Sequence, residues 1–283
     1  MNRKDWTFLT PSSSSLDLSN NVCYDKFINL DIFYNRINYP DDGLSYYHLS
    51  QHYNVNPKNI AIGYGSSELL LRIFNLFRSK TISIKAPTWQ LAELYATNLG
   101  MKISDDGDVL YIANPNGLNG KVLLKEEILS LVNKYEIVIV DEAYGDFSTE
   151  SVATIAPSVE NLIVSKTLSK TVAAPGLRFG FCFANEMLIK QIQDQRPGYV
   201  TFSHTADALQ QLLPQIEYHI QRMLATRNYI EQKYNVLPSK GNYVLFLDDP
   251  MLPVKMKKID SFYRMSLTDL DTFKELENAN RYT

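Results

Sequence analysis

The chain has 283 residues, 45% of them hydrophobic, and carries a formal net charge of -3. This balance gives no basic field for nucleic acid or anionic membranes, and no apolar run approaches the roughly 20 residues that span a bilayer. Only Cys23 and Cys182 are present, and the N-terminus leads into no apolar signal core, so we expect a cytoplasmic protein without a disulfide framework. The length allows one large domain or two smaller ones, and we expect two.

Residues 1–30 are predicted to form an extended arm, because Thr10-Pro-Ser-Ser-Ser-Ser15 disfavours a helix. The alternative is a disordered tail. Four apolar side chains favour an arm that docks on the rest of the protein: Val22, Tyr24, Phe27 and Ile28. A turn at 39–43 then leads into a helix predicted over 44–53.

A predicted anion-binding turn follows the first buried strand, Asn59-Ile-Ala-Ile62. The turn is Gly63-Tyr-Gly-Ser-Ser-Glu68, and an amphipathic helix comes after it. At a helix N-terminus, backbone amides can face a phosphate, here those of Gly65, Ser66 and Ser67. Glu68 stands where a dinucleotide fingerprint has its third glycine, so that class of site is excluded. A plain strand-to-helix turn is the alternative.

Two further strands are predicted over 81–84 and 109–113. Trp89 follows the first of them and could stack on a flat ring, although a tryptophan at a strand end is more often a core or rim aromatic. The second strand runs into the turn-rich loop Asn114-Pro-Asn-Gly-Leu-Asn-Gly120. A helix over 125–135 then follows.

The clearest strand is Ile137-Val-Ile-Val140, which is fully apolar and β-branched. It delivers Asp141-Glu-Ala-Tyr144 at its carboxyl end, where α/β folds place their ligands. Asp141 is therefore a candidate functional carboxylate. Capping of the following turn is an equally good explanation for it.

A lysine loop follows the strand Asn161-Leu-Ile-Val164. A lysine amine such as that of Lys170 can condense with a carbonyl to form a Schiff base, while Ser169 and Arg178 could bind a phosphate. Taken alone, the loop also fits a set of solvated charges. Lys166 is expected to have no part in the chemistry.

The remainder, residues 201–283, is predicted to form a small unit of helices and strands. A long helical stretch over 203–234 should be kinked near Pro214. Strands are expected over 241–247 and 261–267, and a last helix over 269–280.

Strands and helices alternate from residue 59 to about 190, which implies a mostly parallel sheet flanked by helices. Asp141-Glu-Ala-Tyr144 is similar to the motif D-E-A-Y, and Thr167-Leu-Ser-Lys170 with Gly176-Leu-Arg178 is similar to T-L-S-K…G-L-R. On these motifs the chain resembles the fold-type I pyridoxal-phosphate aminotransferases, most of all the histidinol-phosphate aminotransferase branch, from about Leu16 to the C-terminus. The resemblance implies an α/β fold with an arm (1–30), a large cofactor-binding domain (31–200) and a small C-terminal α+β domain (201–283).

By that resemblance, three residues carry the chemistry. Lys170 would bind the aldehyde of pyridoxal 5'-phosphate as a Schiff base and later move the proton between the substrate's α-carbon and the cofactor. Asp141 would keep the pyridinium nitrogen protonated, so that the ring acts as an electron sink. Tyr144 would hydrogen-bond the 3-oxygen of the ring.

The resemblance also implies the residues that hold cofactor and substrate. Arg264 would grip the α-carboxylate of the substrate, with Asn242 nearby and Tyr24 toward a substrate phosphate. The active site would lie at a homodimer interface, with Tyr24 and Tyr39 donated across it. No metal is implied. The expected cofactor contacts are Gly65, Ser66, Ser67, Trp89, Asn114, Asn116, Asp141, Tyr144, Thr167, Ser169, Lys170, Arg178 and Tyr39.

The chain departs from the family at several positions. The asparagine that normally bonds the 3-oxygen falls on Gly117, so either Asn114 or Asn116 replaces it or the contact is missing. The arginine for a substrate phosphate maps onto Lys255, a point charge in place of a fork.

The expected reaction moves an amino group between an amino acid, or an amino-alcohol phosphate such as histidinol phosphate, and a 2-oxo acid. The alternatives are a decarboxylase resembling threonine-phosphate decarboxylase and a relative that binds ligand without turnover.

Overall fold

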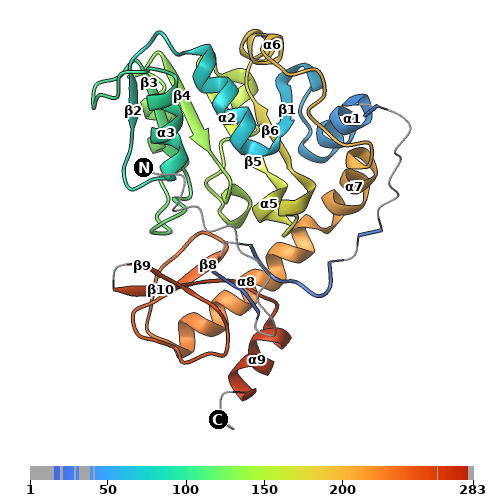
Figure 1. The fold of residues 1–283 in the computed structure, drawn as a ribbon, viewed down its shortest axis with the longest axis vertical. Helices are drawn as coiled ribbons and strands as arrows, with labels where there is room; N and C mark the ends of the chain where they lie inside the picture. The colour runs from blue at the N-terminus through green and yellow to red at the C-terminus, as the bar shows by residue number, and fades with distance from the viewer. Residues whose placement is uncertain are drawn as a thin grey trace.

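The computed structural model describes residues 16–19, 22–28, 30–31, 39–40, 42–259 and 261–279. Residues 1–15 of the predicted arm and the predicted helix end at residue 280 lie outside the described residues. Two β-sheets lie one above the other in Figure 1, and helix α8 (Ile216–Lys233) runs from the larger toward the smaller. Within the described ranges, no helix combines the length and the apolar composition needed to cross a bilayer.

The larger sheet has six strands in the order β1-β6-β5-β4-β3-β2. β2 to β5 pair in parallel, while β6 is antiparallel to both of its neighbours, so the carboxyl ends of five strands and the start of β6 share one edge. This confirms the predicted α/β class with a mostly parallel sheet. The strands are β1 (Ile60–Tyr64), β2 (Ile82–Ile84), β3 (Val109–Ala113), β4 (Ile137–Asp141), β5 (Leu162–Thr167) and β6 (Phe179–Phe183).

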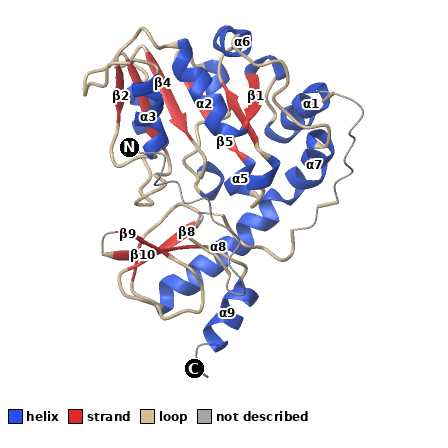
Figure 2. Cartoon of the chain, viewed as in Figure 1, coloured by secondary structure: helices blue, strands red, loops and turns tan. Residues whose placement is uncertain are grey.

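Helices cover both faces of this sheet, which explains why its strands are apolar on both sides (Figure 2). Along β4, for example, Ile139 belongs to one hydrophobic core and Val138 and Val140 to the other. One face packs against α2 (Gly65–Leu76), α3 (Gln90–Asn98) and α6 (Glu186–Asp194). The other face packs against α1 (Asp42–Tyr53), α4 (Lys125–Leu131), α5 (Leu168–Thr171), α7 (Thr205–Leu212) and α8.

Two helix boundaries have local causes. The predicted stretch 203–234 is interrupted by a 3-10 turn, η6 (Leu213–Gln215), because Pro214 has no backbone N–H to continue the helix. Helix α4 ends four residues before the predicted 135, since Asn161 Nδ2 donates to the carbonyls of Val132 and Tyr135 and replaces helical hydrogen bonds there. The other 3-10 turns are η2 (Pro57–Asn59), η3 (Gly145–Phe147), η4 (Ala156–Ser158) and η5 (Pro175–Leu177).

The smaller sheet is antiparallel, in the order β7-β8-β10-β9, and shares a hydrophobic core with α8 and α9 (Leu270–Ala279). The sequence predicts its two central strands, β8 (Tyr243–Phe246) and β10 (Phe262–Ser266). The edge strands β7 (Val236–Leu237) and β9 (Lys257–Ile259) have only two and three residues, too few to show an alternating pattern.

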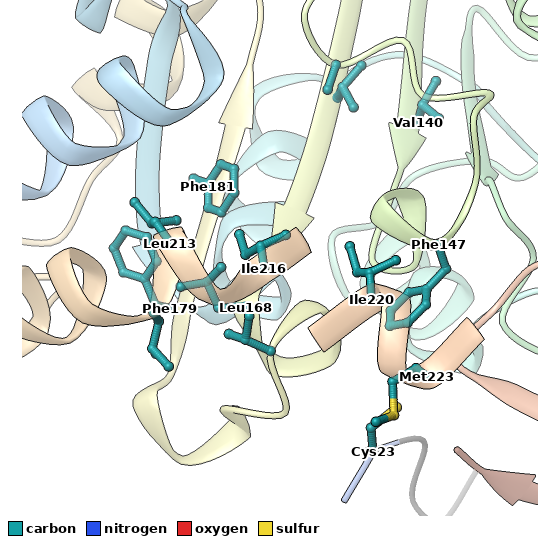
Figure 3. Close-up of a cluster of buried hydrophobic side chains, with 14 of the residues drawn as sticks. Cys23, Val140, Phe147, Leu168, Phe179, Phe181, Leu213, Ile216, Ile220 and Met223 are labelled. Atoms are coloured by element: carbon teal, nitrogen blue, oxygen red, sulfur yellow. The ribbon is translucent and has the colours of Figure 1, made fainter. Parts of the chain in front are cut away.

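The described part of the arm docks on the smaller sheet. Leu18 N donates to Lys255 O, and Tyr24 N donates to Leu267 O. Its buried anchors are Leu18 and Cys23, whereas Tyr24 and Phe27 are exposed. Figure 3 shows Cys23 against Met223 of α8, among the core side chains that reach up to β6.

An ionic cluster fixes the same segment to α8. The Asp25 carboxylate accepts from Arg222 Nη2 (2.7 Å) and lies 2.8 Å from His219 Nδ1. These bonds outweigh the opposing effect of burial and lower the pKa of Asp25 to about 2. The predicted boundary at residue 200 stays a prediction; α7, which follows it, packs against α1 of the preceding domain.

Candidate active site

The shared strand edge of the larger sheet collects most of the residues singled out from the sequence. Each is there because a strand ends and its connecting loop begins at that edge. β1 delivers Gly65, Ser66 and Ser67; β2 delivers Trp89; β3 delivers Asn114 and Asn116; β4 delivers Asp141 and Tyr144; β5 delivers Thr167, Ser169 and Lys170; and Arg178 precedes β6.

Lys170 lies in the one-turn helix α5, which Thr167 caps by accepting a hydrogen bond from Ser169 N (3.2 Å). Burial lowers the pKa of the Lys170 amine to about 8, and the positive charges of Arg264 and Arg178 act in the same direction. The Cys23 thiol opposes them. An appreciable fraction of this amine is therefore unprotonated near neutral pH, as a nucleophilic amine requires.

Asp141 ends β4 and is 6% exposed. Burial raises the pKa of its carboxyl group to about 6. Two hydrogen bonds oppose that rise: Tyr111 Oη donates to Oδ2 (2.9 Å), and Ala143 N donates to Oδ1 (3.1 Å). Sequence reasoning missed Tyr111; its only signal was a phenol in the apolar run Val109–Ala113.

The turn after β1 has the shape of an anion cradle. Helix α2 begins at Gly65, whose φ of +76° disfavours any side chain. A Cβ there would stand 2.4 Å from Arg178 Nη2, so the guanidinium lies directly against the start of the helix. The Ser67 side chain is hydrogen-bonded to Tyr95, which also faces Arg178 and which the sequence gave no reason to select.

Aromatic rings stand beside this cradle. Half-buried Trp89 meets Tyr95 edge to face at 5.8 Å between ring centroids. Tyr144 is buried and packs perpendicular to Tyr243 at 5.9 Å. A Cβ at Gly117 would lie 2.8 Å from the Tyr144 ring, so an asparagine at this position needs the ring to move.

Asn114 and Asn116 are the two candidates to replace the asparagine that the family has at position 117. The side chains of both are already hydrogen-bonded within the protein. Asn114 clamps its own loop, donating to Leu123 O (3.2 Å) and accepting from Leu123 N (2.7 Å). Asn116 donates to Pro87 O (2.5 Å) and accepts from Leu118 N (3.0 Å). Both amides therefore stabilise the loop between β3 and α4.

Arg264 of β10 reaches this site from the smaller sheet and is 5% exposed. Its guanidinium donates to Gly117 O (3.3 Å) and, at 3.5 Å, to Ser19 O of the arm. Both bonds are long, and Nε has no partner among the described residues. Asn242 is fully buried just before β8, and its backbone carbonyl accepts a hydrogen bond from Leu267 N.

Three selected residues lie elsewhere. Tyr39 is 76% exposed and stacks on Tyr199 at 4.4 Å, and Tyr24 is exposed in the arm. Lys255 Nζ pairs with Asp17 (3.1 Å), so its charge is already compensated. In the ranges that the structure describes, no three His, Cys, Asp or Glu side chains form a metal-binding group.

Solved structures share this fold. The histidinol-phosphate aminotransferase from Clostridium acetobutylicum superposes with a TM-score of 0.76 at 19% identity, covering 95% of this chain and 100% of that one. The enzyme of the same name from Sinorhizobium meliloti, solved in complex with pyridoxal-5'-phosphate, gives 0.73 at 17% identity, covering 86% and 82%. L-threonine-O-3-phosphate decarboxylase from Porphyromonas gingivalis gives 0.66 at 18%, covering 86% and 89%.

The residues of this chain fit pyridoxal phosphate. The α2 N-terminus with Arg178 suits a dianionic phosphate, because backbone amides and a guanidinium converge there. A buried carboxylate, Asp141, suits a protonated ring nitrogen, and the Lys170 amine suits an aldehyde. The buried Nε of Arg264 leaves a donor for a carboxylate.

Comparison of sequences gives the family. Histidinol-phosphate aminotransferase from Pyrococcus furiosus is 28% identical over 224 residues, covering 70% of this chain but 65% of the relative, so the chain spans less than two thirds of that protein. The family model described as aminotransferase class I and II matches residues 96–240, just over half of the chain. The chain therefore belongs to the aminotransferase class I and II family.

Proposed function

We propose that this protein is a pyridoxal-phosphate-dependent aminotransferase that moves an amino group between an amino acid, or an amino-alcohol phosphate such as histidinol phosphate, and a 2-oxo acid. The observation that carries the proposal is the half-buried Lys170, whose amine has a pKa lowered to about 8, at the same strand edge as the buried carboxylate of Asp141. A solvated lysine has no cause for such a shift.

Each residue has a defined task. When bound, pyridoxal phosphate supplies an electron sink for the charge left on the substrate's α-carbon. The amides at Gly65, Ser66 and Ser67, with Ser169 and Arg178, would hold its phosphate, while Trp89 would stack on the ring and Tyr144 would donate to the ring's oxygen. Asp141 would accept a hydrogen bond from the ring nitrogen and favour its protonated form.

Lys170 performs two steps with one atom. Its unprotonated Nζ would hold the cofactor through the aldehyde group, and the same atom would take up the proton that leaves the substrate's α-carbon. Arg264 orients the substrate by a bidentate grip on the α-carboxylate, for which its buried guanidinium is placed beside Gly117. Asn242 lines the same end of the site.

We also propose that the enzyme is a homodimer in which Tyr24 and Tyr39 enter the partner's site. In support, both rings are exposed, and Tyr39 stacks on the exposed Tyr199. Sedimentation showing a monomer that binds cofactor and turns over would overturn this. The cytoplasm is the proposed compartment, because the two cysteines are buried and unpaired.

The experiment is a screen of amino donors on cofactor-loaded protein, following the loss of the absorption band of the lysine-bound cofactor. Borohydride should fix the cofactor on Lys170, and Lys170→Ala should lose both fixation and turnover. Lys190→Ala, an exposed lysine of α6, is the matched control. A protein that never takes up cofactor contradicts the proposal.

Decarboxylation is the alternative that the screen separates, since a decarboxylase from Porphyromonas gingivalis shares the fold. Release of carbon dioxide from a phosphorylated amino acid, with no amino group transferred to a 2-oxo acid, would favour it. The pairing of Lys255 with Asp17 leaves Lys255 poorly suited to a substrate phosphate.

A further inference from the structure

Tyr111 is hydrogen-bonded to Asp141, the residue proposed to hold the ring nitrogen of the cofactor. It lies in the middle of β3, is 0% exposed, and packs its ring against Phe74 of α2. β3 and β4 pair in parallel with Ala113 opposite Asp141, so Tyr111, two residues earlier, is on the same side of the sheet as Asp141. Its hydroxyl reaches along the sheet to donate to Asp141 Oδ2 at 2.9 Å.

The balance of effects on Asp141 shows what this bond does. Burial favours the neutral carboxylic acid, and the neighbouring charge of Glu142 favours it too. The bonds from Tyr111 and the Ala143 amide favour the carboxylate. The Ala143 donor is a backbone amide in Asp141's own turn. Among the described residues, the only side chain that donates to this carboxyl group is therefore that of Tyr111.

We propose that Tyr111 is a positioning residue that keeps Asp141 ionised and turned toward the ring nitrogen of the cofactor. The inference rests on the proposed function. Tyr111 does not touch the reacting atoms; it acts through Asp141. Oδ2 of Asp141 accepts from the phenol and Oδ1 accepts from the Ala143 amide, and a carboxylate oxygen has a second lone pair that can accept from the cofactor.

A purely structural role makes a different prediction. A buried phenol needs a hydrogen-bond partner, so Tyr111 could use Asp141 only to satisfy its own hydroxyl. In that case Tyr111→Phe changes stability and leaves the ionisation of Asp141 as it was. Measuring that ionisation in cofactor-free protein therefore separates the two roles.

The test follows the infrared carboxyl band that wild type has and Asp141→Asn lacks, titrated with pH. We expect it to titrate near pH 6 in wild type and about one pKa unit higher in Tyr111→Phe, a tenfold change in proton affinity. Tyr234→Phe, which deletes the same kind of bond to Glu277 far from the site, should leave the band unmoved. An unshifted band in folded Tyr111→Phe overturns the inference.

A second variant tests the inference even if Tyr111→Phe does not fold. Fluorotyrosine at position 111 keeps the shape of the ring and makes the hydroxyl a stronger donor, so the pKa of Asp141 should fall rather than rise. No change, or a rise, also overturns the inference.

Cofactor binding gives an independent readout with a pH signature. The groups that face Asp141 are Tyr111 of β3 and Glu142 of its own loop, with Tyr144 near the phenol. With a shift of one unit, the ionised fraction at pH 6 falls about fivefold while at pH 8.5 it hardly changes. The Kd for pyridoxal phosphate should rise by that factor at pH 6 only. If the protein binds no cofactor but the band still shifts, the proposed function fails and the effect of Tyr111 on Asp141 stands; if Kd rises equally at both pH values, the inference fails.

Discussion

Lys166 at the end of β5 and Lys170 in α5 are only four residues apart, yet their surroundings are opposite. Lys166 Nζ lies 2.8 Å from Asp146 and 3.5 Å from Glu142, above the ring of Tyr53. These two carboxylates raise the pKa of Lys166 despite its burial. Desolvation lowers the pKa of Lys170 to about 8, and the positive charges of Arg264 and Arg178 act in the same direction.

The difference separates a lysine that joins β5 to the loop after β4 from the lysine proposed to react. Lys166 neutralises the buried Glu142 and the partly exposed Asp146 and ties the β4 loop to β5, so its charge is stabilised. Lys170 is placed where its charge is costly, which is what a nucleophilic amine needs. The two loops are further joined by Thr171 Oγ1, which donates to Asp146 at 2.6 Å.

Breaking the ion pairs of Lys166 should have the largest effect on stability. Lys166→Met leaves Glu142 and Asp146 without their cation, and we expect a loss of about 3–5 kcal/mol in the free energy of unfolding at pH 7.5. Urea denaturation measures it. Lys80→Met, which breaks the surface pair with Glu136, is the control and should cost less than about 1 kcal/mol. A similar small loss for both variants would mean that the buried cluster is no stronger than a surface pair.

Removing the Asp141 carboxylate should have the opposite effect and raise the free energy of unfolding. Because the folded pKa of Asp141 is raised to about 6, its contribution to stability is present at low pH and is lost as pH rises through 6. Asp141→Asn should therefore stabilise cofactor-free protein by roughly 2 kcal/mol at pH 8 and by little at pH 4. Thermal melts at the two pH values test this. Equal melting shifts at both would remove the electrostatic explanation.

The same contrast shows what sequence reasoning reaches. The sheet, and the position of Lys170, Asp141 and Arg178 at its edge, could be predicted, because apolar strands and the short motifs that follow or precede them are local patterns in the chain. That Lys166 takes no part in the chemistry stays a prediction; its ion pairs with Glu142 and Asp146 depend on how two strands adjoin and could not be predicted. The edge strands β7 and β9 were missed for lack of length.

Contacts made across the fold could not be predicted either. Tyr111 reaches Asp141 only because β3 and β4 are in a particular register, and Tyr95 reaches Ser67 from a different helix. For the loop after β3, the sequence left Asn114 and Asn116 as candidates for a ring contact; their bonds to Leu123 and Pro87 are set by loop folding.

Lys170→Met sharpens the comparison further. The folded pKa of Lys170 is depressed, so its contribution to stability is present above the unfolded value of about 10.5 and is lost as pH falls through 8. Removing the amine should stabilise cofactor-free protein by roughly 1–2 kcal/mol at pH 7, allowing for partial solvent screening, and the gain should fade between pH 8 and 10.5. Urea midpoints across that range test it, and a destabilised Lys170→Met at pH 7 would contradict it.

The smallest expected effect comes from the hydrogen bond by which Thr171 of α5 joins the Lys170 turn to Asp146, the partner of Lys166. Thr171→Val keeps the shape of the side chain but removes the hydroxyl that donates to Asp146, at a cost of about 1 kcal/mol in stability. If that bond also fixes the turn that carries Lys170, kcat should fall severalfold while KM stays near its wild-type value, because substrate contacts through Arg264 are untouched. Ser130→Ala, which deletes a surface hydroxyl bonded to Glu127 O on α4, provides the control for stability. A Thr171→Val enzyme with unchanged kcat would show that Lys170 is held by α5 and its Thr167 cap alone, and that the paired cluster stabilises the fold without positioning the reactive amine.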